Sequence, residues 1–243
     1  ASRRAACFVA CANSLFYFAR HSLPYDASLC AVMLAVWTAW GPARWQRSFL
    51  TGVWVAVGFL IYNGYWLPGG AVLIAYSLLR ESDGWGGMAR RAVVAGLGLV
   101  TPIALWLLVG HLLEFELVEG LRRFGGTITR GDFGLGYRVV VEYLWASEGF
   151  VVLGLLAFSI AGWAVLLRGR FHARRFVWWA TIAVFLLTGW IVFSDVLAKF
   201  VVYGRLVRVI VPFLCLAAAF GVAQNLSRVR PALRQRMRVA VVI

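Results

Sequence analysis

The chain has 243 residues, 62% of them hydrophobic and 14% charged, and carries a formal net charge of +14. Soluble domains are about 45–50% apolar, so this composition excludes an ordinary soluble fold, whose core could not absorb so much apolar surface. The basic residues stand in short clusters between apolar blocks instead of along one face, so we predict a membrane protein with no nucleic-acid partner.

Apolar blocks long enough to cross about 30 Å of hydrocarbon recur along the chain. We predict membrane spans at residues 5–19, 27–41, 49–64, 67–79, 92–113, 149–167, 176–196 and 207–226. The predicted fold is all-α, a polytopic transmembrane helical bundle of about eight spans in the plasma (inner) membrane. Residues 1–226 form this helical domain, and residues 227–243 form a basic cytoplasmic tail.

The chain begins with alanine instead of methionine, and its first apolar block lacks the cleavage site of a signal peptide. We therefore expect a further N-terminal portion upstream. The four cysteines, Cys7, Cys11, Cys30 and Cys215, lie in apolar blocks without CxxC spacing. We interpret them as small apolar side chains rather than redox or metal-binding groups.

A short external turn, residues 20–28, leads into the second span. Pro24 and Asp26 suit the first turn of a helix, because proline is tolerated there and the helix dipole favours a carboxylate. In this structural interpretation Arg20 extends to the membrane interface. In the functional interpretation Asp26 is an acidic group of an active site, and Arg20 and His21 contact a phosphate or a sugar. The residues alone leave both open.

The third and fourth spans predict a helical hairpin with its tip, Asn63–Gly70, at the membrane surface, because glycine and proline mark a turn there. Tyr62, Tyr65 and Trp66 form either an interfacial anchor or a surface that stacks on a sugar or contacts lipid. The amide of Asn63 lies deep enough to need hydrogen-bond partners.

Gly96-Leu97-Gly98 lies inside the fifth span, so we interpret it as helix packing and not as a nucleotide loop. Walker, HExxH and GxSxG motifs do not occur in the sequence. His111 and His172 are isolated, and we interpret both as structural. The sequence predicts no cofactor and assembles no metal site.

The longest predicted non-membrane stretch is the external loop 114–148, and loops longer than about 12–15 residues are often functional. Its centre, residues 124–136, is rich in glycine. Its charged residues are Glu114, Glu116, Glu119, Arg122, Arg123, Arg130, Asp132, Arg138, Glu142 and Glu148.

Two arginines, Arg205 and Arg208, stand at the mouth of the last span. They share a helix face if that helix begins by Arg205, because they are three residues apart. Guanidinium groups match phosphate oxygens bidentately, so the pair is a candidate phosphate clamp. The alternative is that they pair with Asp195 or with acids of the long loop.

With both termini in the cytoplasm, two thirds of the 24 basic residues fall on the cytoplasmic side, which the positive-inside rule favours. The remainder are Arg20, Arg122, Arg123, Arg130, Arg138, Lys199, Arg205 and Arg208. Among the acidic residues, only Glu81 and Asp83 fall inside. Opposite charges are therefore predicted to meet on the outer face.

Three segments resemble the membrane glycosyltransferases of the GT-C superfamily, particularly the bacterial relatives of dolichyl-phosphate-mannose protein mannosyltransferases and of lipid A aminoarabinose transferases. Residues 19–26 (ARHSLPYD) resemble the family's second external acidic turn, and residues 49–66 (FLTGVWVAVGFLIYNGYW) resemble its hairpin. Tyr203-Gly204-Arg205, leading to Pro212-Phe213, resembles its late segment.

The resemblance implies transfer of a sugar from a polyprenyl-phosphate donor to an acceptor at the external membrane face. The family's principal catalytic acid lies in an earlier external loop, so this chain is either a fragment without that acid or has lost the activity. Asp26 would be the second, catalytic acid. The implied substrate-binding residues are Arg20, His21, Tyr25, Asn63, Tyr65, Arg130, Asp132, Glu142, Glu148, Tyr203, Arg205 and Arg208. The implied partners are the membrane lipid bilayer and the lipid-linked sugar donor.

A different class of function is a transporter or flippase of a lipid-linked or anionic solute, which would use the same arginines as a pathway. Transporters more often have inverted repeats and discontinuous helices near the bilayer midplane, whereas the polar groups here cluster at one interface. A third alternative is a non-catalytic membrane subunit.

Overall fold

The structure, a computed structural model, describes residues 24–40, 44–79, 84–120, 122–123, 136–167, 182, 184, 186, 188–189 and 209–228. The elements in these ranges are α3 (Pro24–Trp40), α4 (Trp45–Ile61), the 3-10 helix η1 (Asn63–Tyr65), α5 (Trp66–Leu79), α6 (Gly84–Leu112), α8 (Gly136–Glu148), α9 (Phe150–Leu167) and α12 (Ile210–Arg228). The all-α prediction is confirmed for this part of the chain.

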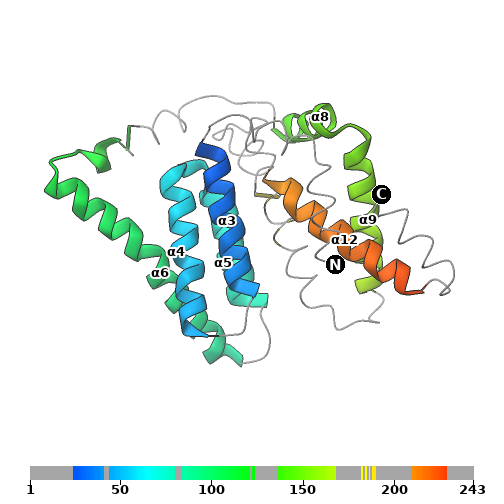
Figure 1. Cartoon of the computed structure of the whole chain (residues 1–243), viewed down its shortest axis with the longest axis horizontal. Coiled ribbons are helices and arrows are strands. Elements are labelled where there is room, and N and C mark those ends of the chain that lie inside the picture. Colours follow the sequence, from blue (N-terminus) through cyan, green and yellow to red (C-terminus); the bar gives the residue numbers. More distant parts are fainter. Residues whose placement is uncertain are drawn as a thin grey trace.

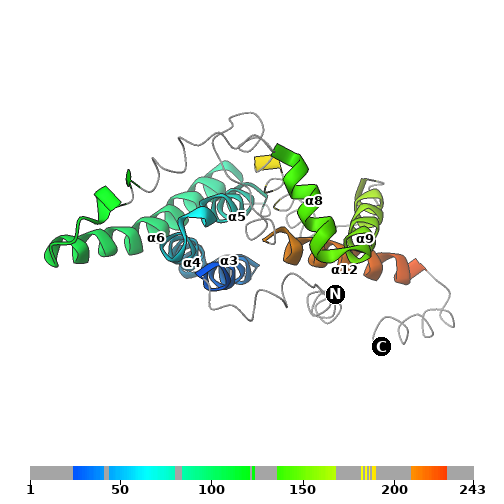
Figure 2. The same ribbon diagram turned by 90° about the horizontal axis from the view of Figure 1, so that it is seen from above.

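The helices form two neighbouring groups (Figures 1 and 2). In the first group α3, α4 and α5 stand side by side, and α6 packs across α4 and then extends away from it. In the second group α9 packs along α12, and α8 turns away from the start of α9. In the first group α4 is therefore the central helix, with α3 on one side and α6 on the other.

The main hydrophobic core lies between α3, α5 and the first turn of α12. Val32, Tyr76 and Phe213 are each fully buried in it, and alanines of α3 and α5 let these helices approach closely. A second cluster joins α9 to α12 and contains Leu155 and Cys215. Cys215 is therefore buried among apolar side chains, as predicted for the cysteines, whereas Cys30 of α3 is exposed.

Glycines hold α4 against α6. A Cβ atom at Gly52 would overlap the carbonyl oxygen of Ala95 and would stand 2.7 Å from the backbone nitrogen of Leu99. A Cβ atom at Gly98 would overlap the backbone of Phe49, whereas Gly96 faces open space. Gly98 therefore has the packing role that the sequence predicts, because only glycine lets the two backbones come this close.

Buried hydroxyl groups connect the helices of the first group. Thr38 Oγ1 and Thr51 Oγ1 lie 3.1 Å apart between α3 and α4, and Ser48 Oγ lies 2.7 Å from Tyr76 Oη between α4 and α5. Hydrogen bonds of this kind satisfy polar groups that would otherwise be costly in an apolar environment.

One described helix, α6, is long and apolar enough to cross a membrane, and the bent pair Val141–Glu148 and Phe150–Ala161 would add a second if it counts as one span. This number is far below the eight predicted spans. Helices α3 and α4 have 17 residues each and α5 has 14, and helices of that length rise only about 21–26 Å. The predicted span 5–19 lies outside the described residues, as does most of 176–196.

Three predicted boundaries are corrected. The hairpin tip is shorter than Asn63–Gly70, because α5 begins at Trp66 and accommodates Pro68 in its first turn. Helix α6 begins at Gly84 and not at residue 92, since hydropathy marks the apolar part of a helix and not its polar start. The predicted loop 114–148 ends in a helix, α8.

Candidate functional site

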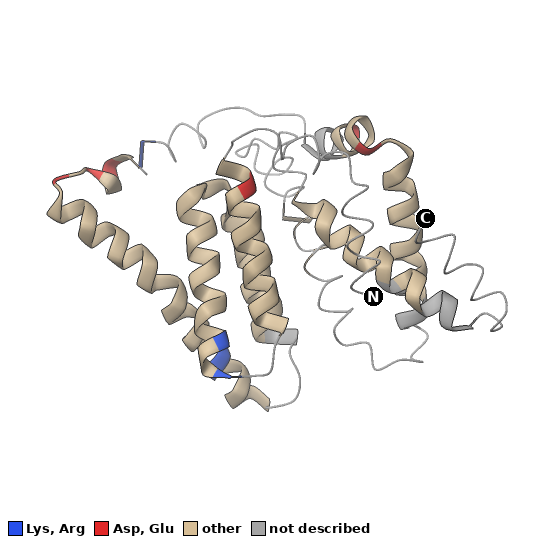
Figure 3. Ribbon diagram, viewed as in Figure 1, with Lys and Arg blue, Asp and Glu red and all other residues tan. Residues whose placement is uncertain are grey.

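The described charged residues are unevenly divided between the two ends of the helices (Figure 3). The described acidic residues gather on the upper side of the view, which we name the acidic end: Asp26, Glu114, Glu116, Glu119, Glu142 and Glu148. The opposite end, which we name the arginine end, carries Arg44, Arg47, Arg90 and Arg91 at the starts of α4 and α6.

One pair of opposite charges also lies at the acidic end. Arg123 Nε donates a hydrogen bond to Glu119 Oε1 at 2.9 Å. Both side chains are exposed, by 75% and 41%, so the pair contributes little to stability.

Asp26 lies in the first turn of α3, which opens at Pro24. The prediction that these two residues begin a helix is confirmed. The side chain of Asp26 is half-buried, and the unpaired amide groups at the start of a helix favour a carboxylate there. This placement also leaves the carboxylate at the acidic end.

Three tyrosines connect the start of α3 to the turn between α4 and α5. The rings of Tyr25 and Tyr62 meet edge to face with centroids 4.5 Å apart, and those of Tyr62 and Tyr65 lie 6.2 Å apart. The ring of Tyr62 covers Gly64, where a Cβ atom would stand 3.1 Å from Tyr62 Cδ1 and closer still to Cε1. Glycine at 64 is therefore required for this ring position.

The structure thus brings together four predicted site residues from two segments, namely Tyr25, Asp26, Asn63 and Tyr65. Asn63 is half-buried. Tyr65 is 1% exposed and belongs to the main core, so it does not form part of the exposed aromatic surface that the sequence predicts. Tyr62, which lies between Tyr25 and Tyr65, is half-buried and therefore remains partly accessible.

Helix α8 brings two further predicted residues to the acidic end. Glu142 is exposed, whereas Glu148, the last residue of α8, is only 5% exposed. Between them Tyr143 and Leu144 pack against the main core. The chain then bends by 114° into α9, and Gly149 makes this bend with a φ of 55°.

The other predicted site residues lie outside the described part of the chain: Arg20, His21, Arg130, Asp132, Tyr203, Arg205 and Arg208. The described C-terminal segment begins with Val209 and Ile210, which are buried in the same core as Tyr65. The phosphate clamp proposed from the two late arginines therefore stays a prediction.

Sequence reasoning singled out Tyr62 only as a surface aromatic and gave no role to Ser28. Ser28 is fully buried on α3, two residues after Asp26, and within the described ranges its hydroxyl has no hydrogen-bond partner. The signal for Tyr62 was the Asn63-Gly64 pair that follows it, since glycine there makes room for a neighbouring ring. Ser28 gave no signal, because burial of one serine depends on how α3 packs on α4.

Among the described residues no group of three or more His, Cys, Asp or Glu side chains gathers in a way that could hold a metal ion. Comparison of the chain with protein-family models, with curated proteins and with solved structures found no match.

Proposed function

We propose that the chain is part of a membrane glycosyltransferase that moves a sugar from a polyprenyl-phosphate donor to an acceptor at the external membrane face. The observation that carries this proposal is the ring contact of Tyr25 with Tyr62 at the start of α3, next to Asp26, at the acidic end of the helices, where α8 also places Glu142 and Glu148. The chain would act as a multi-pass protein, with the arginine end in the cytoplasm.

The spacing of charges along α6 supports the membrane placement. Residues 92–113, between Arg91 and Glu114, contain no Asp, Glu, Lys or Arg, and the distance corresponds to a rise of about 34 Å at 1.5 Å per residue. The hydrocarbon core is about 30 Å thick. Arg91 and Glu114 therefore fit the two interfaces of one bilayer, and the positive-inside rule orients the helix.

The proposed reaction is a displacement at the anomeric carbon of the sugar. The acceptor hydroxyl oxygen forms the new bond to this carbon, the bond to the phosphate oxygen breaks, and the polyprenyl phosphate leaves with the electron pair. A carboxylate takes the proton of the acceptor. General-base catalysis of this kind raises a reaction rate by about 10²–10⁴-fold. We assign this role, or that of orienting the acceptor, to Asp26, and we assign charge neutralisation at the phosphate to Arg205 and Arg208.

The tyrosines beside Asp26 would form one wall of the sugar site. Tyrosine combines an apolar ring with a polar hydroxyl, which suits a ligand that has both hydroxyl groups and C–H faces. Tyr25 and Tyr62 are both half-buried, so their rings are partly accessible to such a ligand.

The test is sugar transfer from radiolabelled polyprenyl-phosphate sugars by membranes that carry the full-length native protein. Asp26→Asn and Arg205→Ala should each lower transfer by about 100-fold or more at equal expression. Glu116→Gln, on an exposed acid of the same end, is the matched control and should transfer at the wild-type rate.

Two outcomes would contradict the proposal. Wild-type rates in both variants would remove Asp26 and Arg205 from the reaction. Absence of transfer across a broad donor panel, together with saturable uptake or flipping of a lipid-linked solute, would favour the transporter.

A further inference from the structure

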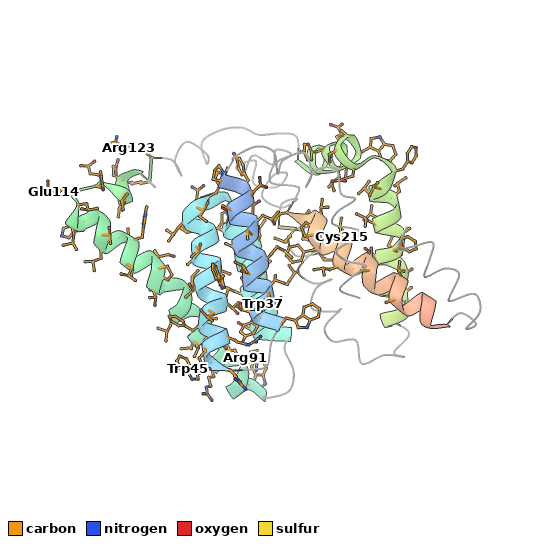
Figure 4. All side chains as sticks on the ribbon, viewed as in Figure 1. Trp37, Trp45, Arg91, Glu114, Arg123 and Cys215 are labelled. Atoms are coloured by element: carbon orange, nitrogen blue, oxygen red, sulfur yellow. The ribbon has the colours of Figure 1, made fainter. Side chains whose placement is uncertain are left out.

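We propose that the arginine end is a binding surface for the headgroups of anionic phospholipids in the membrane leaflet on that side. The inference depends on membrane insertion but not on sugar transfer, because this surface lies at the opposite end of the helices from Asp26 (Figures 3 and 4).

The positive charge of this surface comes from two helices that start side by side. Arg44 and Arg47 stand at the start of α4, and Arg90 lies in the first part of α6. The glycine contact between α4 and α6 brings both starts to the same end (Figure 1). Arg44 and Arg90 are exposed and Arg47 is half-buried, so these guanidinium groups are accessible to a ligand.

The charge is not balanced locally in the described part of the chain, where every acidic residue lies at the acidic end. Glu81 and Asp83 precede α6 in the sequence but lie outside the described residues. Even with both acids present, the four arginines of this end leave an excess of positive charge.

Arg91 differs from its neighbours because it is only 7% exposed. Its Nη2 donates a hydrogen bond to the carbonyl oxygen of Ser77 at 3.4 Å. It therefore joins the start of α6 to the end of α5, which helps to hold the exposed arginines in place.

Exposed tryptophans lie at the same end of the helices as these arginines. Trp85 is 84% exposed, Trp37 67%, Trp45 59% and Trp40 42%, and they come from the last turn of α3 and the starts of α4 and α6. Figure 4 shows Trp45 and Arg91 at the same end of the helices. Tryptophan prefers the headgroup layer of a bilayer, where its apolar ring and its N–H group are both accommodated. These exposed indoles favour a lipid surface over a free anion as the ligand.

The start of α4 adds a second feature that favours a phosphate. Its N-cap residue, Arg44, makes no side-chain capping hydrogen bond. The first amide groups of a helix have no intrahelical partner. An anion bound beside arginine side chains can accept hydrogen bonds from these amide groups and from the guanidinium groups. A phosphodiester headgroup held by Arg44 and Arg47 would meet the guanidinium groups and the helix start together.

The experiment titrates the purified full-length protein in neutral detergent with phosphatidylglycerol or with phosphatidylcholine, and native mass spectrometry counts bound lipid. The wild type should prefer phosphatidylglycerol. The triple variant Arg44→Gln, Arg47→Gln, Arg90→Gln should bind phosphatidylglycerol about tenfold or more weakly, because each basic residue near an anionic surface contributes favourably. The matched control, Arg122→Gln with Arg123→Gln at the acidic end, should keep wild-type affinity.

Two results would overturn the proposal: equal binding of both lipids by the wild type, or unchanged phosphatidylglycerol binding in the triple variant. If the triple variant misfolds, the single variants decide the question, since each should lose a part of the affinity while the control loses none. Displacement of the lipid by millimolar inorganic phosphate would assign the surface to free phosphate instead. Loss of sugar transfer in Asp26→Asn with intact lipid binding would separate this inference from the proposed function.

Discussion

At the scale of single residues, the contact between α4 and α6 depends on glycine. Gly98 lies in this contact and Gly96 does not, so the same substitution can be compared at the two positions. Gly98→Ala should destabilise the protein by about 1–3 kcal/mol, because the added methyl group overlaps the backbone of Phe49. Gly96→Ala, two residues away, places its methyl group in open space and should leave stability unchanged or slightly higher. Thermal unfolding of the purified full-length protein in detergent measures both, and equal melting temperatures would contradict the described crossing.

A second residue-scale prediction concerns the buried hydroxyl pair between α4 and α5. Tyr76→Phe removes one partner of the 2.7 Å hydrogen bond to Ser48 and should cost about 1 kcal/mol. A double-mutant cycle with Ser48→Ala should return a coupling energy of about 0.5–1.5 kcal/mol. Additive effects of the two substitutions would show that the side chains do not interact.

At the scale of helices, α6 is followed by Glu114 in a left-handed backbone conformation that glycine usually adopts. The N–H of Phe115 bonds to the carbonyl oxygen of Gly110 at 2.9 Å, and that of Glu114 bonds to the carbonyl oxygen of His111 at 3.2 Å. This is a Schellman arrangement, whose left-handed residue is normally glycine. Glu114 holds it with a φ of 58°.

Glu114→Gly should therefore stabilise the full-length protein by about 1 kcal/mol, because the left-handed conformation is costly for a residue with a side chain. Glu116→Gly, which removes the same charge without a positive φ, should bring no gain. Denaturant unfolding compares the two variants, and a gain from both or from neither would contradict the strained helix end.

The bend between α8 and α9 gives the converse prediction. Gly149 has a φ of 55°, so Gly149→Ala should destabilise the protein by about 1 kcal/mol. Gly154→Ala within α9, where a Cβ atom meets nothing within 4 Å, should be neutral or stabilising. If Gly149→Ala unfolds at the wild-type temperature, the bend does not require a left-handed residue.

The sequence predicts where helices occur better than where they end. The apolar part of α6 could be read from hydropathy, but its polar start at Gly84 could not. The sequence predicts a loop where α8 lies, because this segment is not apolar throughout. Its polar and apolar residues occupy different faces, as in a helix that lies along an interface instead of crossing it. The sequence predicts too long a turn between α4 and α5. Proline is typical of turns, but Pro68 lies in the first turn of α5, where a helix tolerates proline.

The candidate site was likewise only partly predictable from the sequence. Asp26 at a helix start could be predicted, because proline and a carboxylate favour that position locally. The contact of Tyr25 with Tyr62 and the burial of Tyr65 could not, since both depend on how α3 packs against the α4–α5 turn. Interactions between segments distant in sequence are set by packing, which composition and periodicity do not specify.

At the scale of the whole molecule, the proposed function requires that α6 cross the membrane with the arginine end inside and the acidic end outside. The most direct test places one cysteine at each end of α6, Gly86→Cys or Glu116→Cys, in a full-length protein whose native cysteines, including Cys7, Cys11, Cys30 and Cys215, are replaced. Both positions are exposed. A membrane-impermeant maleimide is then applied to intact cells made permeable only at the outer membrane.

The account predicts that the cysteine at position 116 reacts in these cells, whereas the cysteine at position 86 reacts only after the inner membrane is opened. Reaction of both positions from the same side would contradict the membrane placement, and with it both the external reaction site and the lipid-binding surface. Reaction of position 86 alone from outside would invert the orientation and contradict the proposed function.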